Sequence, residues 1–402
     1  SYGKLGWGME FDVNNSYVNV TTTSFSNSIG TVSAWINMKI NNDGDDYTIF
    51  STAPDDGLIG WWDFNGDAKD KSGNENHGAN SGADLTTDRK GQSNMAYDFI
   101  AGNSDGITIG DKSIFEFGET TSDKPFSVSA WINPDDGATV CEIVSKSNHP
   151  NSMEWFFEVN RYSAGQVILW LYDESEAGNN FAYRLFSSAA PAGVWTHVVG
   201  TYDGRGGSGA DDGMTIYANG GAGGSGARGT YLYMEPTSAS VEIGRHPHGA
   251  GYCDAKIDDV RIYNRELSAT EVIALYNGSI ELYKEDDNLI FDVGNSTVNY
   301  DVSSWNADEW HHVSGTYAQN RADLYADGSK VASTVNITGE LTILDNAYIS
   351  GLITNFNGTI DEFKIWNKAL RPDEIATMYS RSLGAGNITT QNPLAVSVNS
   401  SS

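Results

Sequence analysis

Runs in which apolar and polar residues alternate cover most of the chain. Residues 214–217 (MTIY), 288–293 (NLIFDV) and 322–326 (ADLYA) are typical, and such runs are rich in β-branched and aromatic side chains. A period of two turns one set of side chains towards a core and the other towards solvent, which predicts half-buried strands in antiparallel sheets. Helical spacing is confined to residues 271–276 and 373–379, so we expect one short helix near the end of each domain.

Five sequence blocks occur twice along the chain in the same order. One copy is continuous and contains blocks 126–133, 195–202, 216–220, 257–264 and 268–273. The other copy opens at 31–37 but continues only after the first has ended, at 310–317, 324–328, 360–367 and 371–375. Self-similarity in a fixed order indicates repeated domains. We therefore predict a complete domain at 57–277 inserted into an outer domain formed by 1–54 plus 279–383.

The last segment of the chain, residues 384–402, is a polar tail. Its apolar residues Leu394, Val396 and Val398 alternate with Ala395 and Ser397, as they would in a strand. We therefore predict that this tail is a donor strand, which adds to a sheet of its own chain or of a neighbouring copy.

The chain is strongly acidic, with 24 Lys and Arg against 53 Asp and Glu and a net charge of −29 over 402 residues. Nucleic acids and anionic membranes bind basic surfaces, and no run rich in Lys or Arg occurs, so both partner classes are excluded. No stretch stays apolar for the roughly 18 residues that a membrane helix needs, which excludes membrane insertion. The acidity suits an extracellular or cell-surface protein and supplies carboxylates for hard cations.

The repeated blocks resemble the laminin-G-like (LamG/pentraxin-type) branch of the concanavalin A-like lectin/glucanase superfamily. In the inserted domain the resemblance includes Gly57–Gly66 and Asp70–Gly78 and runs to Tyr276, and in the outer domain it begins at Gly3–Asp12. It implies an all-β fold of two antiparallel jelly-roll β-sandwiches, one nested within the other. The family's opening strand has no counterpart in the outer domain. We therefore expect an open sheet edge there, covered by upstream sequence or by the tail.

Catalysis is not expected. Glycoside cleavage needs a pair of carboxylates at a defined separation. The hydrolases of the superfamily that this sequence resembles carry their catalytic carboxylates on one strand, in a Glu-x-Asp-x-Glu type of pattern. This sequence lacks that pattern. The nearest acidic cluster, Asp173–Glu176, lies in a polar stretch that we expect to be a solvated loop. No Gly-x-Ser-x-Gly nucleophile motif precedes a helix, so we predict a protein that is not an enzyme.

A calcium site is the chemistry that the sequence supports best. Ca²⁺ takes about six to eight oxygen ligands from carboxylates, amides and backbone carbonyls. Such oxygens are concentrated in one Gly-rich loop of the inserted domain, at Asn65, Asp67, Asp70 and Asn76. The resemblance places Asp258 beside this loop as a further ligand. The alternative is a network of Asx turns in which the same side chains cap backbone amides.

Both cysteines of the chain, Cys141 and Cys253, lie in the inserted domain. One follows the Ala-Trp-Ile strand and the other precedes the strand at residue 257, so one disulfide is expected in an oxidising compartment. Two free buried thiols are the alternative, which the separation of the Cα atoms would decide.

Ring side chains in the strand blocks are expected mostly in the cores. His197 and His311 lie in matching blocks and fit that interpretation. His246 and His248, near Cys253, match no standard metal pattern. The Trp residues of the inserted domain that would stack on sugar rings if they are exposed are Trp61, Trp62, Trp155 and Trp170.

Asn-x-Ser/Thr sequons are absent from residues 57–276, although that stretch holds many asparagines. The eight sequons of the chain are at Asn14, Asn19, Asn277, Asn295, Asn336, Asn357, Asn387 and Asn399. We therefore predict an outer domain coated with N-glycans, and an inserted domain left bare for contact with a partner or for burial in an assembly.

Together these features predict a non-enzymatic extracellular cell-surface protein. We expect it to act in adhesion or glycan recognition, or as a glycosylated repeating subunit of a surface filament or coat assembled by strand exchange. Its expected partners are glycans or glycoproteins, or copies of itself in a homopolymer. The alternative function is a pair of carbohydrate-binding modules detached from a secreted polysaccharide-degrading enzyme.

Overall fold

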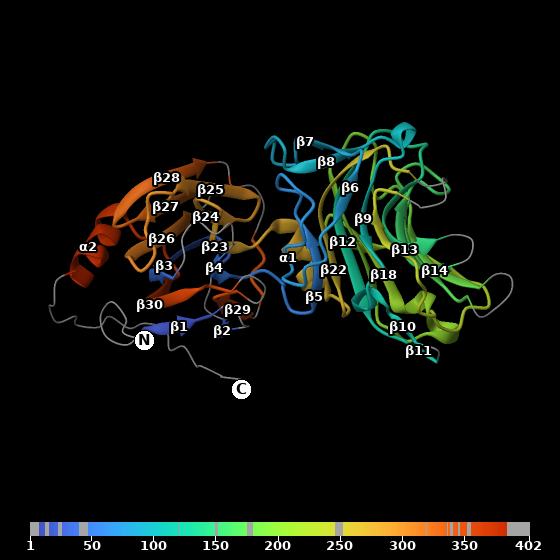
Figure 1. Cartoon of the computed structure of the whole chain (residues 1–402), viewed down its shortest axis with the longest axis horizontal. Coiled ribbons are helices and arrows are strands. Elements are labelled where there is room, and N and C mark those ends of the chain that lie inside the picture. The colour runs from blue at the N-terminus through green and yellow to red at the C-terminus, as the bar shows by residue number, and fades with distance from the viewer. Residues whose placement is uncertain are drawn as a thin grey trace. The chain divides into compact units, whose positions relative to one another are not determined.

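The computed structural model divides the chain into two compact units (Figure 1). The outer unit combines Ser1–Asp56 with Asn277–Ser402, and the insert is Gly57–Tyr276. These junctions lie within two residues of the predicted ones. The residues that the structure describes are 8–12, 16–22, 26–39, 47–119, 121–148, 152–174, 180–245, 252–318, 320–335, 337, 341–344, 346–351 and 355–383.

The insert is a sandwich of two antiparallel sheets. The first runs in the order β19 (Gly221–Gly223), β18 (Met214–Ala218), β17 (Thr196–Tyr202), β12 (Phe126–Pro134), β22 (Ala255–Tyr263), β8 (Ala96–Phe99) and β7 (Asp84–Thr86), with β5 (Leu58–Trp62) also paired with β22. The second runs β20 (Ser225–Arg228), β16 (Phe181–Phe186), β15 (Val167–Tyr172), β14 (Ser152–Val159), β13 (Cys141–Asn148), β21 (Val241–Ile243), β9 (Gly106–Gly110) and β6 (Ala79–Ser81). A small hairpin joins β10 (Gly118–Glu119) to β11 (Ser122–Asp123).

The outer unit repeats this architecture with strands from both ends of the chain, blue at its start and orange to red at its end (Figure 1). One sheet has the order β1 (Met9–Phe11), β30 (Gly358–Trp366), β3 (Ile29–Met38), β26 (Trp310–Ala318), β27 (Arg321–Ala326) and β28 (Ser329–Val335). The other has the order β2 (Val18–Thr21), β29 (Asn346–Ile349), β4 (Tyr47–Ser51), β23 (Ile280–Glu285), β24 (Asn288–Val293) and β25 (Ser296–Asp301). The predicted all-β fold of two antiparallel sandwiches is confirmed.

The insert replaces the loop of a hairpin in the outer unit. Strands β4 and β23 are antiparallel neighbours, with Phe50 opposite Leu282. At their ends the amide of Thr52 donates to the carbonyl of Ile280 at 3.1 Å, and the amide of Ile280 donates to Thr52 Oγ1 at 2.9 Å. The chain therefore leaves and re-enters the outer unit at adjacent positions, the geometry in which a guest domain is tolerated.

Each sandwich encloses its own apolar core, and the repeated blocks supply equivalent parts of it. In the block Gly-Thr-Tyr, an added Cβ at Gly200 would lie 3.2 Å from the ring of Phe157, and one at Gly315 would lie 2.4 Å from the ring of Phe291. Both glycines therefore give space to an aromatic side chain of the facing sheet, which explains why this block occurs in both copies.

A disulfide joins Cys141 and Cys253 within the insert. Both residues are only 1% exposed and belong to the core of the insert, and Cys141 is the first residue of β13. The bond links β13 of one sheet to the segment that enters β22 of the other. The two sheets of the insert are therefore tied covalently across the sandwich.

One α-helix follows the last strand of each unit. It is α1 (Ala269–Asn277) after β22 and α2 (Pro372–Leu383) after β30. At the start of α1 the amide of Glu271 donates to Ser268 Oγ, and the amide of Ser268 donates to the Glu271 carboxylate, which is a capping box. Single 3₁₀ turns occur at Ala101–Asn103, Ser113–Phe115, Gly207–Gly209 and Asp211–Gly213. None of the helices in the described part of the chain is long and apolar enough to cross a membrane.

Candidate functional site

The predicted calcium loop forms a network of capped turns. Asp70 Oδ1 accepts hydrogen bonds from the backbone amides of Trp61 at 3.0 Å and Ser72 at 2.8 Å. Asp70 Oδ2 accepts a further one from the amide of Asn76 at 2.8 Å. Asn76 in turn donates its side-chain amide to the carbonyl of Ile59 at 3.0 Å. These contacts match the Asx-turn alternative, because the carboxylate holds backbone amides.

The other predicted ligands also have protein partners. Asn65 donates its side-chain amide to Asp63 at 3.0 Å. Asp67 accepts the amide of Lys69 at 2.9 Å and pairs with its ammonium at 3.2 Å. Asp258 is ion-paired with Arg89 at 2.6 Å, so a guanidinium already provides positive charge at this carboxylate.

All five predicted calcium ligands make hydrogen bonds or ion pairs within the protein. Within the ranges that the structure describes, no three Asp, Glu, His or Cys side chains are grouped to hold a metal ion. Calcium binding by this protein stays a prediction.

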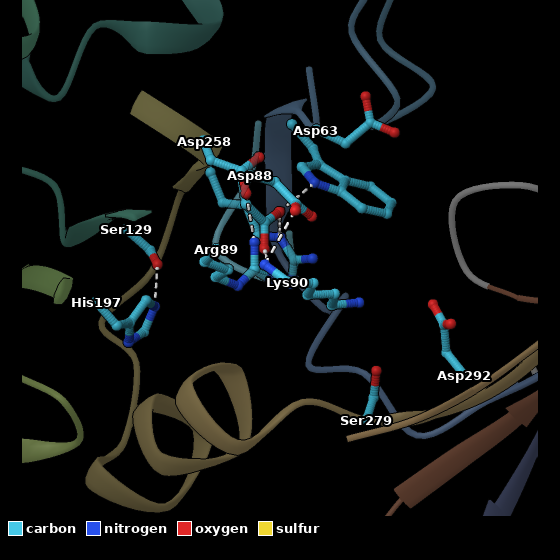
Figure 2. A network of polar contacts seen from close by, with 12 residues as sticks. Asp63, Asp88, Arg89, Lys90, Ser129, His197, Asp258, Ser279 and Asp292 are labelled. Atoms are coloured by element: carbon cyan, nitrogen blue, oxygen red, sulfur yellow. Dashed lines mark hydrogen bonds and ion pairs between the residues drawn. The ribbon is translucent and has the colours of Figure 1, made fainter. Parts of the chain in front are cut away.

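Arg89 is the centre of the polar network in this region of the insert (Figure 2). Its guanidinium pairs with Asp258 at 2.6 Å and with Asp259 at 3.5 Å, and it lies 4.6 Å above the Trp131 ring. Asp258 is 2% exposed. Burial and the neighbouring carboxylates raise the pKa of Asp258, while Arg89 lowers it. The arginine therefore compensates a charge that would otherwise be costly to bury.

A second arginine completes this network from β22. Arg261 Nε pairs with Asp259 Oδ1 at 3.1 Å, and Trp61 Nε1 donates to the same oxygen at 2.7 Å. The Arg261 guanidinium also lies 4.5 Å above the Trp61 ring. Asp259 has a φ of 51°, at a bulge where the register between β12 and β22 shifts. The positive φ of a non-glycine residue turns its carboxylate towards both cations.

A Ser–His–Trp–Tyr group occurs once in each unit. In the insert Ser129 Oγ lies 2.9 Å from His197 Nε2 (Figure 2). The ring of His197 packs against Trp131 and Tyr276. Burial lowers the pKa of His197 to about 3, so the ring is neutral at ordinary pH. Both side chains are buried, so the pair contributes to the packing of the insert.

The matching histidine of the outer unit is His312, not the predicted His311. Ser33 Oγ lies 3.0 Å from His312 Nε2, and the rings of Trp35 and Tyr379 lie beside it. His311 stacks on Trp305 at 3.8 Å instead and pairs with Asp327. Neighbouring strand residues point to opposite faces, so a shift of one position moves the side chain out of the group.

Acidification is expected to destabilise the outer unit. Burial lowers the pKa of His312 from 6.5 to about 4. The unfolded chain takes up a proton at His312 below pH 6.5 and the folded chain only near pH 4, so stability is lost as the pH falls through this window. The loss is about 3 kcal/mol. Hydrogen bonds from His311 and the amide of His312 lower the pKa of Asp327, which acts in the same direction.

Hydrogen exchange at peptide resolution, corrected for intrinsic rates, measures this loss between pH 7 and pH 4.5. Strand β26 of the outer unit should lose protection, and a His312→Gln variant should show a weaker dependence on pH. In the insert, His197 acts in the same direction as His312. The insert should still respond less, because burial raises the pKa of Glu154 and of Asp258 to about 7, and their protonation stabilises the folded insert as the pH falls. An unchanged pH dependence in His312→Gln would contradict the prediction.

The outer face of the second sheet of the insert carries a cluster of aromatic side chains. In β15, Val167, Leu169 and Leu171 point into the core, and the alternate residues Ile168, Trp170 and Tyr172 form the opposite face. Across the strands Phe156, Trp170 and Tyr183 lie directly opposite one another. The ring centroids are 5.7 Å apart for Phe156 and Trp170 and 4.6 Å apart for Trp170 and Tyr183.

The cluster is open to solvent at its edge. Tyr162, in the turn after β14, is 61% exposed, and its ring centroid lies 6.4 Å from that of Trp170. Phe181 and Tyr183 on β16 are half-buried. We define the aromatic face as Phe156, Tyr162, Trp170, Tyr172, Phe181 and Tyr183.

Carboxylates with protein partners border the aromatic face. The Glu158 carboxylate accepts a hydrogen bond from Trp170 Nε1 at 2.7 Å. It also forms an ion pair with Arg161, whose Nη2 lies 2.8 Å away. Burial raises the pKa of Glu158. Glu142 lies directly opposite Glu158 on β13, and burial with this neighbouring charge raises its pKa well above the ordinary value. Nearer the start of β14, Glu154 pairs with the buried ammonium of Lys146 at 3.2 Å.

The outer unit lacks the aromatic face at the matching sheet position. In the insert the row lies next to the core pair Phe157 and Leu169. In the outer unit the row next to the core pair Leu282 and Phe291 carries the polar residues Glu281, Asp292 and Thr297. The aromatic face is therefore a property of the insert, and the repeated scaffold does not require it.

The remaining predicted residues lie in different surroundings. Trp62 and Trp155 are fully buried core residues, so of the four candidate Trp residues only Trp170 belongs to the aromatic face. Asp173 was expected in a solvated loop but is buried and accepts the amide of Leu232 at 2.8 Å. The four described sequon asparagines are partly exposed, at Asn19, Asn277, Asn295 and Asn357. The sites outside the described residues are His246, His248, Asn14, Asn336, Asn387, Asn399 and the tail 384–402.

Comparisons with solved structures find β-sandwich binding domains at low identity. The binding domain of Paraclostridial mosquitocidal protein 1 is 14% identical, with a TM-score of 0.43 over 68% of this chain and 76% of that chain. Domain 4 of the GH43 extracellular arabinanase AbnA from Geobacillus stearothermophilus, in complex with arabinotriose, is 21% identical, with a TM-score of 0.35 over 55% and 98%. Domains LG4-5 of the mouse laminin alpha1 chain are 13% identical, with a TM-score of 0.32 over 72% and 94%. No curated protein matches the chain.

A family comparison finds one model twice along the chain. The model of the concanavalin A-like lectin/glucanases superfamily matches residues 101–273 and residues 276–376. The first match lies in the insert and the second begins at its last residue and covers the C-terminal part of the outer unit. The repeated blocks and the two sandwiches agree with both matches. The chain belongs to the laminin-G-like branch of the concanavalin A-like lectin/glucanases superfamily.

Proposed function

We propose that this protein is a non-enzymatic extracellular binding protein whose insert recognises a glycan through the aromatic face. The observation that carries the proposal is the row of Phe156, Trp170 and Tyr183 across three strands, bordered by the exposed ring of Tyr162. Phe156 and Trp170 are themselves only 4% and 5% exposed, so the accessible part of the aromatic face is its rim, at Tyr162, Tyr172, Phe181 and Tyr183. A cluster of rings that reaches solvent outside the sandwich core is a candidate binding surface.

The chemistry of the aromatic face suits a sugar ring. Apolar C–H faces of a sugar pack on aromatic rings, and its hydroxyl groups need polar partners at the rim. Arg161 is partly exposed and offers guanidinium donors at this rim, held in place by its pair with the buried Glu158, which also accepts Trp170 Nε1. The combination of an apolar floor and a polar rim favours a neutral glycan over an extended apolar ligand.

The carboxylates near the aromatic face support a binding role over hydrolysis. Glu158 is held by Arg161 and Trp170, and Glu154 by Lys146 and Thr237. A glycosidase needs one free general acid and one free base or nucleophile on either side of the scissile bond. Side chains that are locked in such pairs serve as scaffold for the surface.

The proposed location of the protein at the cell surface rests on the distribution of its sequons. Sequons confined to the outer unit and tail suit a glycosylated cell-surface protein that acts in adhesion, with the bare insert in contact with its partner. Assembly of copies into a filament or coat stays a prediction. The alternative of carbohydrate-binding modules detached from a secreted polysaccharide-degrading enzyme shares the same aromatic face and differs only in what the full protein carries.

The test is glycan binding by the full chain, first on a glycan array and then by calorimetry with the glycan selected. Tyr162→Ala and Tyr183→Ala should each weaken binding about tenfold, because an aromatic contact is worth about 1 kcal/mol or more. Tyr300→Ala is the matched control, since Tyr300 is a partly exposed tyrosine of the outer unit, 37% exposed. An array without selective binding, or full affinity in both insert variants, would contradict the proposal.

A further inference from the structure

Strand β30 of the outer unit has a long free edge among the described residues. On one side β30 pairs with β3 along its length, from Met38 opposite Gly358 to Thr31 opposite Trp366. On the other side β1 pairs only with its first residues, up to Met9 opposite Ile360. Within the described ranges no strand lies beside Phe363–Trp366 on that side.

The equivalent strand of the insert, β22, has this edge filled. Its first residues pair with β8, as those of β30 pair with β1. Its last residues pair with the antiparallel strand β5, with Trp62 opposite Val260 and Gly60 opposite Ile262. The repeated fold therefore has a place for one more strand at this position of the sheet.

The residues of β30 at this position are less buried than the matching residues of β22, as expected for a strand without a neighbour. Val260 and Ile262 of β22 are 0% exposed. Their counterparts Phe363 and Ile365 pack against the core of the outer unit, yet both are partly exposed. Phe363 contacts the buried ring of Phe50, with 5.5 Å between the ring centroids. An apolar strand added here would complete the core, whereas an unpaired edge of this kind invites association.

We propose that residues 394–398 of the same chain occupy this edge as an antiparallel strand beside Phe363–Trp366. In the segment LAVSV, the apolar side chains Leu394, Val396 and Val398 would share the core face with Phe363 and Ile365. The small residues Ala395 and Ser397 would lie on the opposite face with Lys364. Strand β5 shows the same chemistry in the insert, because Trp62 fills the core from this position.

The length of chain allows this strand to come from the protein's own tail. Helix α2 stacks Tyr379 on Trp35, with 5.5 Å between the ring centroids, and Trp35 lies opposite Asp361 on β30. The helix ends at Leu383, about one turn beyond Tyr379. The ten residues 384–393 span up to about 33 Å, which is enough to return to the edge. A tethered segment also acts at an effective concentration in the millimolar range, far above that of a second copy in dilute solution.

Hydrogen exchange of the peptide that covers Phe363–Trp366 tests the proposal in the full chain. Val396→Asp should accelerate exchange at this edge at least tenfold, because it places a charge in the completed core. Ser397→Asp is the matched control, since its side chain would lie on the opposite face and should leave protection nearly unchanged. Equal exchange in the wild type, in both variants and in a chain ending at Leu383 would overturn the proposal.

Disulfide trapping identifies the source of the strand. Lys364→Cys combined with Ala395→Cys or with Ser397→Cys should form a bond within one chain, seen as an unlinked monomer on a non-reducing gel with a cross-linked peptide by mass spectrometry. A ladder of linked chains would overturn the assignment to the chain's own tail. The proposal goes beyond the glycan-binding function, because removal of the tail should leave binding by the insert intact.

Discussion

Arg89→Ala is expected to lower the free energy of unfolding of the insert by about 3–5 kcal/mol. The substitution leaves the carboxylate of Asp258, 2% exposed, without its partner at 2.6 Å. It also removes the cation that lies 4.6 Å above the Trp131 ring. The loss is large because a buried charge that has lost its partner keeps the full cost of its removal from water.

Urea unfolding followed by hydrogen exchange at peptide resolution would assign this loss to the insert. Arg371→Ala is the control, because Arg371 has a side chain that is 67% exposed and pairs with Asp373, and its loss should cost less than about 1 kcal/mol. Arg89→Met combined with Asp258→Asn should recover most of the stability, since no uncompensated charge remains. If Arg89→Ala matches Arg371→Ala, the interpretation of Arg89 as the compensating charge is wrong.

Removal of the disulfide is expected to have an effect of similar size. Cys141 and Cys253 are 112 residues apart, and the chain-entropy relation for a loop of this length predicts a loss of about 4–5 kcal/mol in the unfolding free energy of the insert. The physical reason is that the bond restricts the unfolded chain, so its loss increases the entropy of the unfolded state. The Cys141→Ser and Cys253→Ser double variant tests this without a reductant.

The outer unit serves as an internal control for the disulfide. The chain has two cysteines, and both lie in the insert, so the unfolding of the outer unit should not change in the double variant or in the reduced wild type. An equal loss of stability in both units would show that the effect is not confined to the loop that the bond closes. Unchanged stability of the insert would contradict the prediction itself.

The aromatic face cannot be recognised from the sequence alone, because its central strand shows no alternation of apolar and polar residues. Residues Val167–Tyr172 form the continuous apolar run VILWLY, in which both faces of the strand carry apolar side chains. A half-buried strand is recognised by alternation, and this run has none. Trp170 was therefore one candidate among four Trp residues. Only the tertiary structure shows that its ring joins the aromatic face, whereas the ring of Trp155 lies in the core between the two sheets.

The loop after β5 is easily found in the sequence, but its chemistry is ambiguous there. The Asp and Asn residues of the loop after β5 are equally suited to calcium and to Asx turns. In the structure the backbone brings the amides of Trp61, Ser72 and Asn76 to the oxygens of Asp70, as in Asx turns, which the sequence does not show. The pairing of Arg89 with Asp258 joins residues that are 169 positions apart, and no local pattern announces it.

The class of fold and its unusual connectivity follow from the pattern of residues along the chain. Alternating blocks set the strands, and five blocks in one order, one copy split by the other, placed the junctions within two residues. Contacts in the folded protein determine which charges are paired, which of two adjacent histidines joins the Ser–His–Trp–Tyr group and which apolar cluster lies outside the sandwich core. They also determine which strand edge lacks a neighbour among the described residues. These features depend on contacts between distant residues, whereas periodicity records only the face on which each residue lies.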